Sequence, residues 1–206
     1  MNTPDERTDT SCGFIALVGA PNAGKSTLLN SLVGTKVSIV THKAQTTRSQ
    51  VRGVLTLDSA QLVFVDTPGI FAPKRRLDRA MVESAWGGAG DADLVAFILD
   101  AERGITPDIE TLLEGLENIR QPKVLILNKI DAVKHESLLA LSQTLNERLR
   151  FEATFMLSAL KGHGVKDFID WCVKHIPPGP WHFPEDHLTD LTMAITAAEI
   201  TREKLF

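Results

Sequence analysis

The segment that most constrains the fold is GAPNAGKST, at residues 19–27. It lies between an apolar run, FIALV, typical of a buried strand, and an amphipathic run, LLNSLV, typical of a helix. Gly19, Gly24, Lys25 and Ser26 fit the pattern GxxxxGK[ST] in the strand–loop–helix context that this pattern requires. Glycines let successive N–H groups curl around an anion, and the helix start adds positive potential. The segment predicts a phosphate-binding loop; a glycine-rich turn without a ligand is the alternative.

Three residues at the end of this loop have individual expected roles. Lys25 supplies a charge for the β- and γ-phosphates, Ser26 supplies a hydroxyl ligand for Mg²⁺, and Thr27 adds a backbone contact near the α-phosphate. The predicted triphosphate-binding residues are Gly19, Ala20, Pro21, Asn22, Ala23, Gly24, Lys25, Ser26 and Thr27.

Apolar runs and amphipathic segments alternate along most of the chain. Strands are predicted at 14–19, 51–57, 61–66, 93–100, 123–128 and 152–157, and helices at 25–34, 77–90, 107–119, 135–149 and 164–175. This alternation favours a doubly wound α/β fold with a mostly parallel six-stranded sheet. The short gap around Asp58 and Ser59 predicts an antiparallel hairpin, which makes one edge strand antiparallel.

The ends of the chain differ in character from this central part. We expect residues 1–12 to be a disordered lead-in, 13–176 a nucleotide-binding domain, and the proline-rich 177–190 a linker. Residues 191–206 read as one further amphipathic helix. No apolar run suits a signal peptide or a membrane span, and two cysteines without metal-ligand spacing favour a reducing compartment, so a cytoplasmic location is expected. The net charge of −4 gives no indication of nucleic-acid binding through overall charge.

Three further segments follow predicted strands, at the sheet edge where open α/β sheets bind ligands. Asp66, Thr67, Pro68 and Gly69 form DTPG, in which Asp66 could hold Mg²⁺ through water and the Gly69 N–H could meet the γ-phosphate. Taken alone, DTPG is also a common turn.

The other two segments concern the base. Asn128, Lys129 and Asp131 belong to NKID, where the Asp131 carboxylate can accept both N1–H and the 2-amino group of guanine. Adenine has no such donor pair, so the motif predicts guanine over adenine. Asn128 can tie the base edge to the phosphate loop, and the Lys129 stem can cover the base face. Ser158, Ala159 and Leu160 form SAL, which could place the Ala159 N–H on guanine O6.

The set resembles the translation-factor-related branch of P-loop GTPases, and most closely the Era family. The resembling segments are GAPNAGKSTLLN, KAQTTR (43–48), VDTPGI (65–70), NKID (128–131), SALKGHGV (158–165) and the tail PEDHLTD…EITREKLF, so the likeness covers residues 12–206. It implies a G domain that binds GTP and GDP with Mg²⁺ and hydrolyses GTP. It assigns Mg²⁺ to Ser26, Thr47 and Asp66, with Thr46 as the alternative to Thr47.

The resemblance gives catalytic roles to Lys25, Thr47, Gly69 and Asn22. Ile70 stands where Ras-like proteins carry a water-orienting glutamine, and isoleucine cannot orient water, so slow intrinsic turnover is expected. Relatives of this branch use an asparagine at the place of Asn22 to help hold K⁺, which could stabilise transition-state charge. The equal alternative is that Asn22 satisfies the turn backbone.

The resemblance also implies a role in small ribosomal subunit assembly and 16S rRNA processing. Family members bind the 3′ end of that RNA through a C-terminal KH domain, of which 191–206 would be the first helix, so RNA binding is expected of the full-length parent. A monomer, no DNA partner and a peripheral inner-membrane contact are further expectations. The competing readings are a binding module with negligible turnover, another GTPase of the same branch and an ATP-specific P-loop enzyme.

Overall fold

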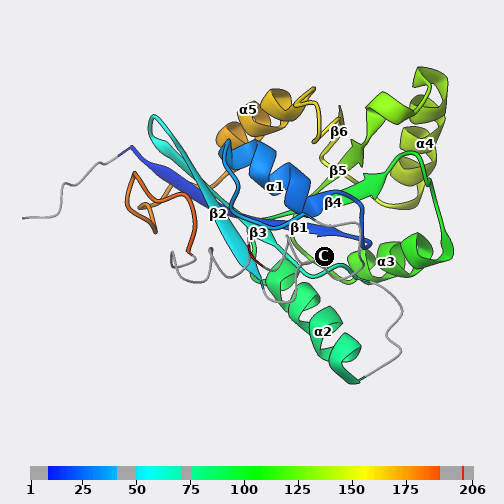
Figure 1. Ribbon diagram of the computed structural model, residues 1–206, viewed down its shortest axis with the longest axis horizontal. Helices are drawn as coiled ribbons and strands as arrows, with labels where there is room; N and C mark the ends of the chain where they lie inside the picture. The colour runs from blue at the N-terminus through cyan, green and yellow to red at the C-terminus, as the bar shows by residue number, and fades with distance from the viewer. Residues whose placement is uncertain (1–8, 41–49, 71–75, 191–200, 202–206) are drawn as a thin grey trace, which may run out of the picture.

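The computed structural model describes residues 9–40, 50–70, 76–190 and Thr201. One six-stranded sheet, in the order β2-β3-β1-β4-β5-β6, forms the centre of the molecule (Figure 1). The strands are β1 (Ser11–Gly19), β2 (Val51–Leu57), β3 (Ala60–Asp66), β4 (Leu94–Asp100), β5 (Lys123–Asn128) and β6 (Ala153–Leu157). Only the β2–β3 pair is antiparallel among these strands, which confirms the predicted sheet with one antiparallel edge strand.

Helices cover both faces of this sheet (Figure 1). They are α1 (Lys25–Val33), α2 (Arg76–Gly90), α3 (Pro107–Glu117), α4 (His135–Arg148) and α5 (Val165–His175), with a 3₁₀ turn, η1 (Ile130–Ala132). Local signals explain several boundaries. Pro107 begins α3 with Asp108 and Glu110 in its first turn, and Gly34 ends α1 in a left-handed conformation while its N–H donates to Asn30.

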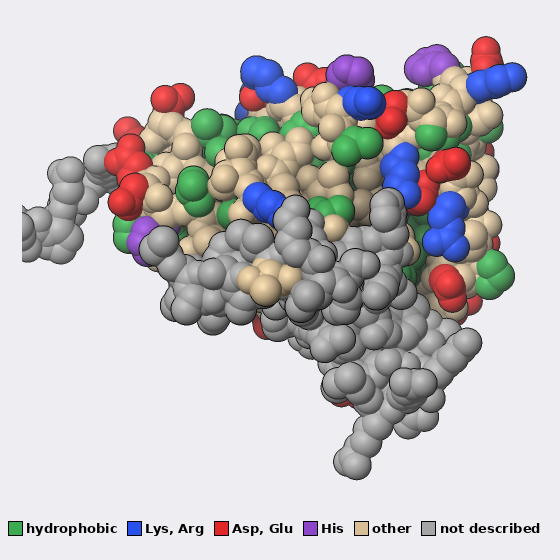
Figure 2. Space-filling model, in the orientation of Figure 1, with side chains coloured by type: hydrophobic (Ala, Val, Ile, Leu, Met, Phe, Trp, Pro, Cys, Tyr) green, Lys and Arg blue, Asp and Glu red, His purple; other side chains and the backbone are tan. Residues whose placement is uncertain are grey.

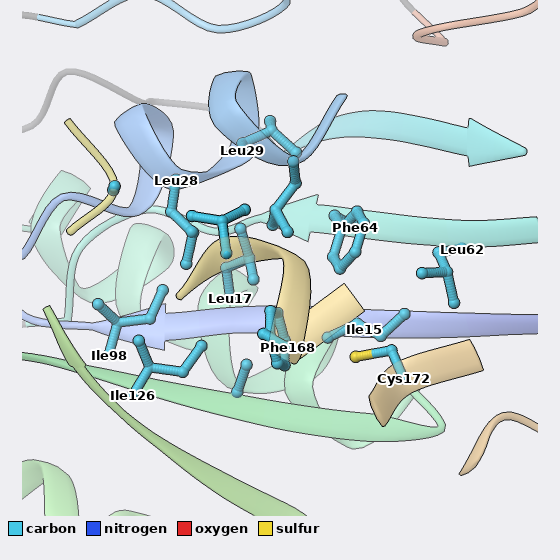
Figure 3. Close-up of a cluster of buried hydrophobic side chains, with 14 of the residues drawn as sticks. Ile15, Leu17, Leu28, Leu29, Leu62, Phe64, Ile98, Ile126, Phe168 and Cys172 are labelled. Atoms are coloured by element: carbon cyan, nitrogen blue, oxygen red, sulfur yellow. The ribbon is translucent and has the colours of Figure 1, made fainter. Parts of the chain in front are cut away.

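The central strands β1, β3, β4 and β5 are almost entirely buried, and successive residues pack into two different layers. In β1, Ile15 and Leu17 pack with α1 and α5, whereas Ala16 and Val18 pack on the side of α2, α3 and α4. Figure 3 shows the first layer, in which Phe168 of α5 lies among side chains from the sheet and α1. Because helices cover both faces of the sheet, the side chains on both faces of these strands are apolar. The strands therefore appear in the sequence as continuous apolar runs.

The first strand begins earlier than predicted. Ser11 and Cys12 were expected in the lead-in, but they belong to β1 and pair with Ala60 and Gln61. Their other side is also occupied, since the Cys12 N–H donates to the Pro177 carbonyl at 3.2 Å. Pairing with residues this distant in sequence leaves no local signal. The polar composition of residues 1–12 therefore wrongly predicted that Ser11 and Cys12 lie outside the sheet.

The segment 177–190 is fixed to the β2–β3 hairpin at several points. The Gln61 side chain is fully buried; its Oε1 accepts the N–H groups of His182 and Phe183 at 2.9 and 3.0 Å, and its Nε2 donates to the Phe183 carbonyl at 2.8 Å. Further along, the Val54 N–H donates to the Leu188 carbonyl at 2.9 Å. The linker of the sequence prediction is therefore held in place against the sheet.

Several predicted features lie outside the described residues. These are KAQTTR with Thr46 and Thr47, and nearly all of the helix expected at 191–206, of which Thr201 is described in helical conformation. Among the described residues, no helix has the length and apolarity needed to cross a bilayer.

Candidate nucleotide-binding site

The phosphate loop joins the end of β1 to the start of α1. Asn22 and Gly24 take left-handed backbone conformations, with φ of 63° and 95°. A Cβ at Gly19 would lie 2.4 Å from the Ile98 carbonyl oxygen, and one at Gly24 would lie 2.2 Å from Asn128 Nδ2. Close neighbours thus require glycine at both positions, and at Gly24 the left-handed backbone requires it as well.

Lys25 is buried at the first position of α1, inside this loop. Its Nζ donates to the carbonyls of Gly19 and Ala20 at 3.1 and 3.0 Å. Burial lowers the pKa of Lys25 to about 8, and the charge of Asp66 partly opposes that shift. The ammonium group is bonded to two neutral carbonyls of the loop, so a phosphate bound there would give it an anionic partner.

Two hydroxyl groups converge on the Asp66 carboxylate, which is fully buried at the end of β3. Ser26 Oγ donates to Asp66 Oδ2 at 2.7 Å, and Ser38 Oγ donates to the same oxygen at 3.1 Å. Asn30 of α1 holds Ser38 in place, because its Oδ1 accepts the Ser38 N–H and its Nδ2 donates to the Ser38 carbonyl. Hydroxyl and carboxylate oxygens suit Mg²⁺, so the residues present fit that ion.

Ser38 was not predicted from the sequence. It follows Val37 in an ordinary apolar run, and nothing in its spacing distinguishes it from a surface serine. Its contact with Asp66 depends on a turn that Asn30 closes.

The DTPG segment is anchored against the phosphate loop. Thr67 is fully buried and its Oγ1 donates to the Leu17 carbonyl at 2.8 Å. A Cβ at Gly69 would lie 2.9 Å from the backbone of Pro21, so glycine lets the two loops touch. The Ile70 N–H donates to the Gly19 carbonyl, and the Ile70 side chain is buried in the layer of α2, α3 and α4. Ile70 therefore packs as a core residue.

Asn128 joins three loops at the end of β5. Its Nδ2 donates to the Ala23 carbonyl at 2.8 Å, while its Oδ1 accepts the N–H groups of Lys129 and Ala159 at 2.8 and 3.0 Å. Asn128 is thus bonded to the phosphate loop, and its contact with the edge of the base stays a prediction. The Ala159 N–H, which the sequence suggested for guanine O6, is used here by Asn128, so guanine would have to share it or displace that bond.

Asp131 and Leu160 lie on the exposed side of these base loops. A hydrogen bond from the Ser158 side chain lowers the pKa of Asp131, with a smaller contribution from the charge of Lys161. The carboxylate is therefore ionised at neutral pH and free of proton competition for the donors of a guanine edge.

The described site residues come together at the carboxyl ends of β1, β3, β5 and β6. Ser26 meets Asp66, Gly69 meets Pro21, and Asn128 meets both Ala23 and Ala159. Of the predicted site residues, Thr47 and its alternative Thr46 lie outside the described residues, and the others are described. One strand-end edge thus brings together the residues predicted to contact phosphate, metal and base.

Comparisons with known proteins agree with this geometry. The model of the 50S ribosome-binding GTPase family matches residues 14–129. GTPase Era of Mesorhizobium japonicum is 63% identical over 201 residues, covering 98% of this chain and 65% of its own. GTPase Era of Sinorhizobium medicae is 58% identical over 211 residues, covering 99% of this chain and 68% of its own.

A solved structure extends the likeness to three dimensions. The crystal structure of Era in complex with MgGDPNP and nucleotides 1506–1542 of 16S ribosomal RNA has a TM-score of 0.90 at 40% identity, covering 95% of this chain and 67% of that one. The chain spans about two thirds of the length of these relatives. On the identity, the extent of the match and the shared fold, the chain belongs to the Era family of GTPases.

Proposed function

We propose that this chain binds GTP and GDP with Mg²⁺ and hydrolyses GTP as a molecular switch. The observation that carries the proposal is Asn128, whose side chain joins the phosphate loop to both base loops and so couples recognition of guanine to recognition of phosphate. The Era structures with MgGDPNP and with GDP·AlF4⁻ support the choice of nucleotide and metal.

In this proposal the chain's own residues divide the work. The Lys25 ammonium and the N–H groups of residues 19–27 hold the phosphates, while Asp131 and Asn128 orient guanine. Ser26 and Asp66, with Thr47, would hold Mg²⁺, which neutralises charge on the β- and γ-phosphates when bound. Thr67 anchors the DTPG loop to β1, and Gly69 lies close against Pro21 of the phosphate loop. In this proposal the Gly69 N–H meets the γ-phosphate.

Turnover is expected to be slow. Ile70 packs in the core, so the position after Gly69 contributes no group that could orient water. This observation also favours a second candidate, a nucleotide-dependent binding module with negligible hydrolysis. Phosphate release at saturating GTP and Mg²⁺ separates the two, because a rate no higher than that of protein-free buffer leaves binding alone.

Guanine selectivity is tested with Asp131→Asn. Wild-type protein is expected to prefer GTP over ATP by at least about 100-fold, since an unpaired carboxylate in the ATP complex costs binding energy. Asp131→Asn should lose most of that preference, whereas Asp170→Asn, an exposed carboxylate on α5, should keep it. Equal affinities of wild-type protein for ATP and GTP would overturn the assignment.

Potassium dependence belongs to the same proposal. Asn22 lies in a left-handed turn of the phosphate loop, which suits either a K⁺ ligand or a residue that stabilises the turn. If Asn22 helps to hold K⁺, hydrolysis is faster in K⁺ than in Na⁺, and Asn22→Ala removes the difference. Equal wild-type rates in the two salts leave the turn role.

The wider role is proposed from the relatives. We propose that residues 11–176 form the GTPase domain, that 177–190 connect it to an RNA-binding unit beginning within 191–206, and that the whole protein acts on the small ribosomal subunit. The 16S rRNA in an Era structure supports this role. The described part of the face in Figure 2 intersperses basic and acidic side chains, so the GTPase domain itself shows no large basic patch there. A cytoplasmic monomer, with peripheral contact to the inner membrane, completes the proposal.

A further inference from the structure

Asp100 is a buried carboxylate at the nucleotide edge that none of the sequence motifs includes. It closes β4, where it pairs with Asn128 of β5, and its side chain is 8% exposed. Burying a carboxylate is costly unless its oxygens are bonded, so the partners of Asp100 indicate what it does.

The two oxygens of Asp100 have separate partners. Oδ1 accepts the N–H groups of Glu102 and Arg103, at 3.0 and 3.4 Å, and so stabilises the turn after β4. Oδ2 accepts a hydrogen bond from Lys129 Nζ at 2.6 Å. The bond from Lys129 connects Asp100 to the NKID segment, and the turn after β4 does not need this bond.

Lys129 is fixed at both of its ends. Its backbone is left-handed, with φ of 66°, and its N–H donates to Asn128 Oδ1 at 2.8 Å. Its ammonium group is held by Asp100, while its side chain as a whole stays 36% exposed. A lysine side chain that is ordered before a ligand arrives does not lose that rotamer freedom on binding.

We propose that Asp100 is a positioning residue for the guanine site, holding the Lys129 ammonium so that its methylene stem forms a ready-made surface for one face of the base. The inference rests on the proposed guanine binding and names a residue that sets its affinity. The ligand is a guanine nucleotide, and the contribution of Asp100 acts entirely through Lys129.

Two substitutions separate this role from support of the turn. Asp100→Asn keeps an oxygen for the N–H groups of Glu102 and Arg103 but loses the charge that holds Lys129. Lys129→Met keeps an unbranched stem of similar length but removes the ammonium group. The two variants and their double mutant form a cycle in which only a coupled pair gives non-additive effects.

The experiment measures Kd for Mg·GDP and Mg·IDP by calorimetry, and KM and kcat for GTP. Asp100→Asn is expected to raise Kd for GDP about tenfold in the wild-type background and less than twofold in the Lys129→Met background. KM for GTP should rise while kcat changes less than twofold. IDP lacks the 2-amino group that Asp131 reads, so the ratio of the two Kd values should stay as in wild type.

Other outcomes overturn the proposal. An equal loss of affinity in both backgrounds would make Asp100 a support of the turn only, and a collapse of the GDP-to-IDP ratio would mean that the whole NKID loop had been deformed. Asp170→Asn breaks an exposed ion pair with Lys166 on α5 and should leave every value unchanged. Urea unfolding of each variant confirms the folded fraction. Failure of wild-type protein to bind GDP would overturn the proposed function itself, whereas an unaffected Asp100→Asn overturns this inference alone.

Discussion

The Lys25 ammonium group couples nucleotide binding to pH. Burial lowers its pKa to about 8 in the structure, and a phosphate beside it would favour the charged form and raise that pKa. Binding then takes up a proton when the pH lies above about 8. The affinity for GDP is therefore expected to be constant below that pH and to fall as the pH rises through it, by at most tenfold per pH unit.

Calorimetric Kd values for Mg·GDP between pH 7 and pH 9 test this expectation. Lys25→Arg provides the control, because a guanidinium stays charged throughout this range. Its profile therefore contains only the contributions of groups other than residue 25, including the nucleotide. A wild-type profile parallel to that of Lys25→Arg would mean that Lys25 stays charged without a ligand.

Gly24 and Gly34 have similar backbones but different surroundings. Both have positive φ, 95° and 77°, so alanine adds backbone strain of about 1–2 kcal/mol at each. A Cβ at Gly24 would also displace Asn128 Nδ2, whereas nothing lies within 4 Å of one at Gly34. Gly24→Ala is expected to lower the free energy of unfolding by about 2–4 kcal/mol in urea titrations, and Gly34→Ala by about 1–2 kcal/mol. Equal losses of unfolding free energy in the two variants would show that the Asn128 side chain moves away from the new Cβ without destabilising the fold.

At the scale of elements, local patterns predicted the helices and strands with small errors. Apolar runs predicted the strands, and the turn at Asp58 predicted the boundary between β2 and β3. Pro107 and Gly34 likewise mark ends of α3 and α1 that local chemistry decides. The start of β1 was missed because its partners, Ala60 and Pro177, are distant in sequence. Boundaries fixed by long-range pairing carry no local signal.

The residues of the candidate site also fall into two groups, those that the sequence predicted and those that depend on contacts made by the fold. Motif residues such as Ser26 and Asn128 were found because their chemistry depends on spacing along the chain. Ser38 and Asp100 were missed, because each acts through one contact that the folded sheet creates. A polar residue at the end of a strand beside Asn128 was the available signal for Asp100, and for Ser38 the sequence offered none.

The Gln61 side chain on β3 holds the segment 177–190 against the sheet. Removing its amide leaves the backbone groups of His182 and Phe183 without their partners on β3. Gln61→Ala is expected to lower the free energy of unfolding by about 2 kcal/mol and to speed hydrogen exchange at those two amides. Gln143→Ala, which removes an exposed bond to Glu147 on α4, should change neither. Unchanged exchange in Gln61→Ala would place the anchor elsewhere, for instance at the Val54–Leu188 bond.

At the scale of the whole molecule, the site lies where the sheet order reverses. The chain leaves central β1 through the phosphate loop, builds β2 and β3 on one side, and returns to build β4, β5 and β6 on the other. A ligand at this point contacts loops from both halves of the sheet, which is the expected location in doubly wound folds. A bound nucleotide should therefore stabilise the molecule as one unit.

The size of that stabilisation follows from mass action. GDP with Mg²⁺ at 100 times its Kd is expected to raise the free energy of unfolding by about 2.7 kcal/mol, because the unfolded chain has no assembled loops to bind it. ADP at the same concentration should add far less, since adenine lacks the donor pair that Asp131 accepts. Urea unfolding monitored by fluorescence of the three tryptophans, Trp86, Trp171 and Trp181, measures both effects.

The position of Trp86 makes the test specific to coupling between the halves. It lies on α2, and a Cβ at Gly115 of α3 would lie 2.3 Å from its ring, so it reports on the packing of α2 against α3. If GDP stabilises the fold as a unit, a protein that retains only Trp86, with Trp171 and Trp181 changed to Phe, shows the same rise in unfolding midpoint as far-ultraviolet circular dichroism. A shift in one signal without the other would mean that the nucleotide secures its own loops while the two halves of the sheet unfold separately.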